Sequence, residues 1–238
     1  MREEPLIMGK NCLHEVLKTN PKAIQKIFTS KENDPILKKA KGFNIPIQFV
    51  PKPRLSAMVN SESHQGVVAR LYQRAYPDLR SFLRNPSEKS LILMCDGITD
   101  PQNFGAILRA AECFGVDGVI FSKNRSVEIT PVVTKASVGA SELVPLLRVS
   151  NLAETMKRFQ EAGFTAIAAD VGEKSKRLDI FTFPDKTLLI LGAEGRGVQP
   201  LLKRKADACV EIPLSGQIDS LNVSQAASIL LFKASGQK

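Results

Sequence analysis

The chain is poor in residues that bind metal ions. Its 238 residues include only four cysteines and two histidines, the side chains that structural zinc sites favour. The cysteines stand singly inside apolar runs, without a C-x-x-C pair, at Cys12, Cys95, Cys113 and Cys209. This spacing excludes the usual zinc motifs. We therefore predict that the four cysteines are buried free thiols and that the protein holds no metal.

Long apolar segments are also missing. No stretch approaches the roughly 18 uninterrupted apolar residues of a membrane-spanning helix, and the N-terminal sequence MREEPLIMGK lacks the apolar core of a signal peptide. Hydrophobic residues still make up 43% of the chain, enough for one large or two small domains with ordinary cores. We predict a soluble globular protein of the cytoplasm.

Positive charge is concentrated in the first third of the chain. Residues 1–74 contain 13 Lys and Arg against 6 Asp and Glu, a net charge of +7, whereas the remaining 164 residues contain 20 against 18, a net charge of +2. Phosphate contacts supply most sequence-independent affinity for nucleic acids. The distribution favours a basic RNA-docking module joined to a nearly neutral body, although a solvated lysine-rich surface explains the charge equally well.

The first third has the pattern of a compact α/β unit. A helical pattern over 10–18 places Leu13, Val16 and Leu17 on one face. Strand patterns lie at 23–28, 45–50 and 66–72. A polar stretch punctuated by Pro77 and Pro86 follows. We predict an RNA-binding domain over 1–74 and a linker over 75–89.

From residue 90 onward, apolar strand patterns alternate with helical ones. The strand patterns lie at 91–95, 116–122, 143–149, 164–170, 187–192 and 208–214, and the helical ones at 103–114, 151–163 and 222–234. Unbroken apolar strands separated by helices indicate a parallel sheet covered on both faces. Ligands of such sheets bind at the carboxyl ends of the strands, so chemistry is expected in the loops that follow them.

Three of these loops are distinctive. The first, 96–105, leads into a helix on which Gly105, Arg109 and Glu112 share the face opposite the apolar stripe. Arg109 therefore projects toward solvent or a cleft, and an exposed helix arginine is often only a solvated charge. The second loop, 192–197, has three glycines in six residues, which lets main-chain groups line a ligand. An ordinary turn is the alternative.

The third loop, 212–224, leads into the last helical segment. Ser220 or Asn222 can cap this helix without any chemistry. Its spacing predicts a complete buried stripe of Val223, Ala226, Ala227, Leu230, Leu231 and Ala234.

Together the three loops resemble the three motifs of the SpoU branch of the SPOUT RNA methyltransferases. They read N-x-G-x-x-x-R from Asn103, G-A-E-G-x-G from Gly192, and I-P-L-S-G-x-x-x-S-L-N-V-S from Ile212. The segments LIMGKNCLHEVL and HQGVVAR resemble the N-terminal substrate-binding domain of bacterial 23S rRNA guanosine-2′-O-methyltransferases, a ribosomal-protein-like α/β fold. The resemblance covers essentially the whole chain.

This resemblance implies transfer of a methyl group from S-adenosylmethionine to a ribose 2′-hydroxyl of structured RNA, with a guanosine of 23S rRNA as the expected target. It implies a homodimer whose active site draws on both chains, and a catalytic domain over 90–238 with a C-terminal trefoil knot. The expected cofactor-binding residues are Leu191, Gly192, Gly197, Ile212, Pro213 and Leu221. The expected catalytic residues are Asn103, Arg109, Glu194, Ser220 and Asn222.

The family assigns activation of the hydroxyl to the arginine that matches Arg109. A guanidinium with a pKa above about 12 is a poor base. We therefore expect Arg109 to orient the hydroxyl and stabilise developing alkoxide charge, with the proton passing to Glu194 or water. The alternative role of Glu194 is to anchor the loop geometry through backbone N–H groups. Asn103, Ser220 and Asn222 are expected to supply neutral hydrogen bonds.

Two alternatives remain open. A tRNA target is the main one within this class, and a non-catalytic RNA-binding or ribosome-assembly protein is the one outside it. Loss of activity would show first at Asn103, Arg109, Glu194 or Asn222, and all four match. A nucleotide-dependent oxidoreductase is disfavoured because Pro200 stands where the dinucleotide fingerprint needs a third glycine. Recognition of a 2′-hydroxyl requires RNA, so DNA is not an expected substrate.

Overall fold

The computed structural model describes residues 5–73, 76–84, 87–124, 126–172 and 174–236. They form two compact units, one from the described residues of Met1–Ala75 with Glu128–Leu143, the other from those of Tyr76–Val127 and Val144–Lys238. The segment Glu128–Leu143 thus packs with the first unit, although it lies within the range predicted for the catalytic domain. None of the helices in the described ranges is long and apolar enough to cross a membrane.

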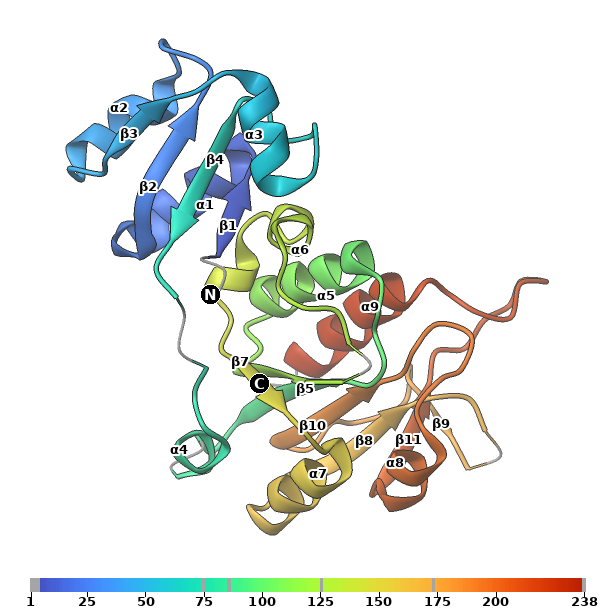
Figure 1. The fold of residues 1–238 in the computed structure, drawn as a ribbon. Coiled ribbons are helices and arrows are strands. Elements are labelled where there is room, and N and C mark those ends of the chain that lie inside the picture. Colours follow the sequence, from blue (N-terminus) through green and yellow to red (C-terminus); the bar gives the residue numbers. More distant parts are fainter. Residues whose placement is uncertain (1–4, 74–75, 85–86, 125, 173, 237–238) are drawn as a thin grey trace. The chain divides into compact units, whose positions relative to one another are not determined.

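The first unit is built around a four-stranded mixed sheet (Figure 1). The strand order is β1-β4-β2-β3, with β4 antiparallel to β1 and β2, and β3 parallel to β2. Its elements are β1 (Leu6–Met8), α1 (Lys10–Thr19), η1 (Pro21–Ala23), β2 (Ile24–Thr29), α2 (Pro35–Gly42), β3 (Ile47–Phe49), α3 (Lys52–Val59), β4 (Val67–Leu71), α6 (Pro131–Ala136) and η2 (Ala140–Glu142).

Side chains that alternate in direction along the strands of this unit pack into two separate hydrophobic cores, one on each face of the sheet. Ile27 packs in one cluster with residues of α1 and α2, whereas the next residue, Phe28, packs in another with residues of α3. Val67 and Val68 of β4 divide in the same way, because successive side chains of a strand point to opposite faces. The helix predicted over 10–18 is confirmed as α1, and its predicted apolar residues are buried.

The second unit holds a seven-stranded sheet whose order is β7-β6-β5-β10-β8-β11-β9. Every pairing in it is parallel, which confirms the predicted parallel sheet. Its elements are α4 (Leu79–Leu83), β5 (Ser90–Cys95), α5 (Pro101–Cys113), β6 (Gly118–Ser122), β7 (Leu146–Val149), α7 (Leu152–Glu161), β8 (Thr165–Ala169), β9 (Lys176–Arg177), β10 (Lys186–Leu191), α8 (Pro200–Lys205), β11 (Ala208–Glu211) and α9 (Val223–Ser235).

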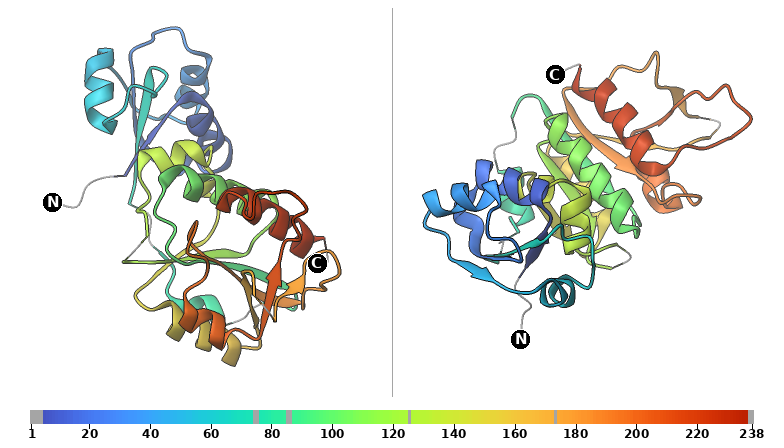
Figure 2. Two further views of the ribbon diagram at one scale, coloured as in Figure 1. Left: turned by 90° about the vertical axis from the view of Figure 1, so that its right-hand side faces the viewer. Right: turned by 90° about the horizontal axis from the view of Figure 1, so that it is seen from above.

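Helices cover both faces of this sheet (Figure 1). α5 and α9 lie side by side on one face, as Figure 2 also shows, and α4, α7 and α8 lie on the other. The central strand β10 is buried from Thr187 to its end, as expected for a parallel strand with helices on both sides. Met156 and Phe159 of α7 are fully buried against it.

A short helix, α4, occupies part of the predicted linker, of which residues 75, 85 and 86 lie outside the described residues. Its Phe82 packs against the sheet core, and a Cβ atom at Gly118 would lie 2.5 Å from the Phe82 ring. The glycine therefore makes room for this aromatic side chain. Apolar packing of Leu79, Phe82 and Leu83 overrides the polar character of the surrounding sequence.

The burial of two predicted core positions is corrected by the structure. Cys113 is exposed, because it lies in the last turn of α5 on the side away from buried Ala111, and Cys209 is only partly buried. The predicted stripe of α9 is buried except at Ala226, which is partly exposed because it faces a pocket.

Candidate active site

The loops after β5, β8, β10 and β11 lie at the same edge of the parallel sheet. There, a pocket of about 290 Å³ opens between the segment after β8, the loop after β10 and the segment leading into α9. Apolar side chains and backbone line much of it, and the lining includes Asp170, Glu194, Glu211 and Asp219. This is the position expected for a ligand of an open α/β sheet.

The glycine loop after β10 folds tightly back on itself. Gly197 N–H donates to the Ala193 carbonyl at 2.9 Å, and the two residues form an isolated antiparallel bridge. A Cβ atom at Gly192 would lie 2.0 Å from the carbonyl carbon of Gly197. Any side chain at Gly192 would therefore force the loop apart. Both glycines line the pocket, so main-chain atoms form this part of its wall.

Asp170, directly after β8, anchors the end of this loop. Its Oδ2 accepts a hydrogen bond from Val198 N–H at 2.9 Å, and its Oδ1 pairs with Lys203 Nζ at 3.0 Å. A Cβ atom at Gly197 would lie 2.6 Å from the same carboxylate. Asp170 was not among the predicted site residues, although its position at the end of a predicted strand is the feature that could have identified it.

Asp96 plays the corresponding part at the end of β5. Its carboxylate is almost fully buried and accepts from Gln199 N–H at 2.8 Å and from the Gln199 side-chain amide. The neighbouring thiol of Cys95 is inert, because burial, with a further contribution from Asp96, raises its pKa to about 12. Together, Asp96 and Asp170 hold the two residues that follow the glycine loop.

Asn103 connects the three predicted motif loops. It lies in the first turn of α5, where Asp100 caps the helix by accepting from Gln102 N–H at 3.1 Å and Asn103 N–H at 3.3 Å. The Asn103 Nδ2 donates to Glu194 Oε2 at 3.3 Å, and its Oδ1 accepts from Asn222 Nδ2 at 2.9 Å. Because each amide atom has a defined partner, the orientation of the Asn103 side chain is fixed.

Asn222 serves two purposes at once. Its Oδ1 accepts from Ser224 N–H at 2.9 Å and so caps α9, which confirms one of the two predicted capping residues. Its Nδ2 remains available for Asn103. Capping and site assembly are therefore compatible at this position.

Most of the predicted site residues lie at or beside the pocket. Its lining includes the predicted residues Leu191, Gly192, Glu194, Gly197, Ile212, Ser220 and Leu221. Asn103 stands next to the pocket through its bond to Glu194, and Asn222 through its bond to Asn103. Pro213 is exposed and outside the lining.

Arg109 does not lie among the predicted site residues at the pocket. Its side chain is exposed on α5, and it does not line the pocket of its own chain. Within the described part of the chain, no hydrogen bond or ion pair holds its guanidinium.

Family models match both units of the chain. The model of the SpoU rRNA methylase family matches residues 90–232, and the model for RNA 2′-O ribose methyltransferase substrate binding matches residues 6–77. The fold and these matches define an RNA 2′-O-methyltransferase with a substrate-binding region ahead of its catalytic region. The chain belongs to the SpoU (TrmH) family.

Relatives match over nearly the full length. The 23S rRNA (guanosine-2′-O-)-methyltransferase RlmB of Shewanella oneidensis is 37% identical over 246 residues, which cover 100% of this chain and 99% of that protein. A Staphylococcus aureus (strain MSSA476) protein named for the TrmH family of tRNA/rRNA methyltransferases is 38% identical over 239 residues, covering 97% of this chain and 95% of that protein.

Solved structures share the fold. The AdoMet-bound rRNA methyltransferase of Sinorhizobium meliloti has a TM-score of 0.78 at 24% identity, covering 97% of this chain and 86% of that chain. The SpoU methyltransferase AviRb of Streptomyces viridochromogenes, in complex with AdoMet, has a TM-score of 0.80 at 21% identity, with 98% and 89% covered.

Proposed function

We propose that this protein transfers the methyl group of S-adenosylmethionine to the ribose 2′-hydroxyl of a guanosine in 23S rRNA. The observation that carries the proposal is the hydrogen-bonded series Asn222–Asn103–Glu194, which joins three loops beside one pocket. The identity of 37% to the Shewanella oneidensis enzyme over the whole chain supports the choice of RNA and nucleoside.

The pocket suits S-adenosylmethionine in size, lining and charge. Its volume of about 290 Å³ lies near the lower end of the range of about 300–1,000 Å³ typical of small-molecule sites. Leu191, Ile212 and Leu221 offer apolar surface for an adenine ring, and the bare backbone at Gly192 allows close approach. Carboxylates and no basic side chain occur among the described residues of its lining, which favours a cationic ligand. The bound cofactor supplies a methyl group on a positively charged sulfur.

We assign proton acceptance to Glu194. The side chain is exposed at the pocket, and Asn103 holds its Oε2. A ribose hydroxyl is a weak nucleophile, so a positioned carboxylate at its proton promotes attack. Ser220, exposed in the same lining, is placed to hydrogen-bond the ribose. Asn222 acts through Asn103 and is a positioning residue.

We further propose a homodimer whose active site draws on both chains. In this arrangement Arg109 of one chain acts at the pocket of the other chain, because it does not line the pocket of its own. Its guanidinium orients the ribose hydroxyl and the adjacent phosphate of the RNA bound there. Ile229 and Phe232 of α9 are 41% and 69% exposed and supply apolar surface for such an interface. The trefoil knot belongs to the same proposal. It is supported by the membership of the chain in the SpoU family.

Transfer of tritiated methyl groups from S-adenosylmethionine tests the proposal, with unmodified 23S rRNA and unmodified tRNA as parallel acceptors. We expect label in 23S rRNA, and we expect Arg109→Ala to keep less than about a tenth of the turnover while RNA binding is unchanged. Label in tRNA alone would retain the reaction and overturn the proposed substrate. Absence of label in both would contradict the enzymatic function.

A further inference from the structure

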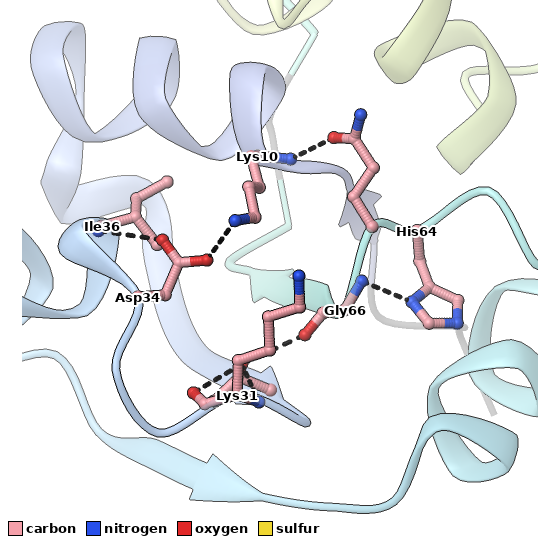
Figure 3. Close-up of polar contacts among 8 residues, drawn as sticks. Lys10, Lys31, Asp34, Ile36, His64 and Gly66 are labelled. Atoms are coloured by element: carbon pink, nitrogen blue, oxygen red, sulfur yellow. Dashed lines mark hydrogen bonds and ion pairs between the residues drawn. The ribbon is translucent and has the colours of Figure 1, made fainter.

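A second hollow lies in the first unit and is lined by none of the residues of the proposed active site. It has a volume of about 790 Å³, and its lining includes Lys10, Lys31, Lys52, Glu62, His64 and Gln65. Figure 3 shows several of these side chains around the turn from His64 to Gly66. The turn belongs to the HQGVVAR segment, to which the proposed reaction assigns no catalytic or cofactor-binding residue.

The floor of the hollow is rigidly built. His64 is buried, and its Nδ1 accepts from Gly66 N–H at 3.0 Å (Figure 3). Its Nε2 lies 3.1 Å from Ser56 Oγ. Because Nδ1 is an acceptor, the neutral ring carries its proton on Nε2. The Gly66 carbonyl accepts from Ser30 N–H and from Thr29 Oγ1, both at 3.0 Å. The turn is therefore fixed from both sides.

Gln65 is held in the left-handed region, with φ of 57°, between these two anchored residues. Its Oε1 accepts from Lys10 N–H at 2.8 Å and so caps α1, whose N-cap residue, Gly9, has no side chain. The Nε2 group of Gln65 therefore remains as a donor, and no protein acceptor within the described residues binds it.

The lysines around this turn differ in their pairing. Lys10 Nζ forms an ion pair with Asp34 at 2.5 Å, so its charge is largely compensated. Lys31 and Lys52 are exposed, and within the described residues neither ammonium group forms an ion pair, although the charge of Lys31 helps to lower the pKa of Asp34. Lys135 of α6 lies near the same turn and donates to the Ser63 carbonyl at 2.8 Å. Glu62 is the one carboxylate among the lining residues described.

We propose that this hollow binds a phosphate group of the RNA backbone, through the ammonium groups of Lys31 and Lys52 and the Nε2 group of Gln65. The inference rests on the proposed function, which makes RNA the substrate. Ammonium and amide donors match phosphate oxygens. The described lining contains no Phe, Tyr or Trp side chain, and the one ring in it, that of His64, is buried in the floor and held by hydrogen bonds, so the contact reads the backbone and not the sequence.

Salt-dependent binding of an unmodified 23S rRNA transcript to the full-length protein, measured by filter binding, tests this inference. We compare the wild type with the pair Lys31→Gln/Lys52→Gln and with the matched pair Lys22→Gln/Lys41→Gln, which removes two exposed lysines of the same unit outside the hollow. Each phosphate contact contributes about 0.7–0.9 to the slope of log K against log salt. We expect the first pair to lower the slope by about one to two and the affinity by about 10-fold.

The control pair should leave slope and affinity nearly unchanged, and both pairs should bind S-adenosylmethionine as the wild type does, which verifies folding. An equal effect of the two pairs, or no effect of the first pair, would overturn the inference. Methyl transfer by the wild type to the same transcript is measured alongside. Loss of slope in the first pair only, without methyl transfer by the wild type, would support the phosphate site and reject the proposed reaction.

Discussion

Asn103 uses both atoms of its amide to join parts of the chain that are distant in sequence. The bonds to Glu194 and Asn222 span 91 and 119 residues along the chain. Aspartate caps, backbone turns and amide groups hold the three motif loops together beside the pocket, where few side chains are fully buried. Among the described residues, the carboxylate of the proposed base is therefore aligned by a hydrogen bond from the neutral Asn103 amide and not by an ion pair.

The substitution Asn103→Ala tests this dependence. It removes the donor to Glu194 and the acceptor for Asn222, so we expect the methyl-transfer rate to fall about 10- to 100-fold, because small misplacements of a reacting group are costly. The affinity for S-adenosylmethionine, measured by calorimetry, should change less than about three-fold. Gln102→Ala, at the exposed neighbouring position of the same helix, is the control. Equal rates for the two variants would contradict the role of Asn103.

His64 provides a prediction on pH dependence. Burial, followed by the charge of Lys52, lowers its pKa; Lys135 acts in the same direction and Glu62 opposes it. Because the folded pKa lies below the unfolded value of about 6.5, the unfolded chain takes up the proton first as pH falls. The free energy of unfolding therefore decreases as pH falls from about 6.5 toward the folded pKa, and the contribution is fully present above that window.

Imidazole resonances in a nuclear magnetic resonance titration measure this pKa directly. We expect a value below that of free histidine and an Nε2–H tautomer, as the bond from Gly66 N–H requires. A pKa at or above about 6.5, or an Nδ1–H tautomer, would contradict the arrangement of the turn.

At the scale of single residues, the sequence predicted some members of the candidate site and missed others. Glu194, Ser220 and the cofactor residues of the second and third loops were assigned by motif, and all of these except Pro213 line the pocket; their roles stay a prediction. Asp170 was missed, because an aspartate after a strand has many uses and its partner, Val198, lies 28 residues away. The sequence equally could not predict that Arg109 has no hydrogen-bond or ion-pair partner among the described residues, since helical periodicity gives a direction but no distance to a ligand.

At the scale of elements, periodicity predicted the long segments best. The parallel strands β5, β6, β7, β8, β10 and β11 and the helices α5, α7 and α9 were expected, because their apolar patterns extend over many residues, whereas the two-residue strand β9 was not. The short helices α2, α3 and α4 were not predicted. α4 has only five residues, and its formation depends on packing against residues distant in sequence. The association of Glu128–Leu143 with the first unit likewise depends on tertiary contacts.

The glycine loop after β10 is the element most sensitive to a single added atom. In Gly192→Ala the new methyl group would overlap the backbone of Gly197, at 2.0 Å, so the loop must open. We expect the affinity for S-adenosylmethionine to fall about 10-fold or more, since overpacking of this kind costs about 1–3 kcal/mol. Calorimetric titration measures the change.

Gly216→Ala is the matched control for that substitution, because the nearest atom to a Cβ there is 4.0 Å away. We expect its affinity for the cofactor to stay close to that of the wild type. Wild-type affinity in Gly192→Ala would show that the close approach of the two glycines is not needed for binding.

At the scale of the whole molecule, the boundary between the basic and the nearly neutral part of the sequence lies close to the boundary between the two units of the fold. The basic excess of +7 lies in residues 1–74, and the phosphate site inferred above lies in the corresponding unit. Composition predicted a basic docking module without showing which lysines serve it, because pairing with acids such as Asp34 is a tertiary property. The catalytic loops lie in the nearly neutral remainder.

The proposed homodimer leads to a prediction at the same scale. Phe232 is 69% exposed on α9, and a charge there would be buried without a partner in an interface. We expect sedimentation of the wild type as a dimer and of Phe232→Glu as a monomer with reduced turnover. Phe49→Glu, which changes a phenylalanine exposed to 54% in the first unit, should remain dimeric. A monomeric wild type would contradict the proposal.

The proposed reaction itself is tested most directly by mapping 2′-O-methyl groups on an unmodified 23S rRNA transcript after incubation with the protein and S-adenosylmethionine. Resistance to alkaline hydrolysis locates the group, and mass spectrometry of the released nucleosides identifies it. We predict 2′-O-methylguanosine at a defined site, formed only when S-adenosylmethionine is present. A methyl group on a base, or an unmethylated 23S rRNA, would contradict the account.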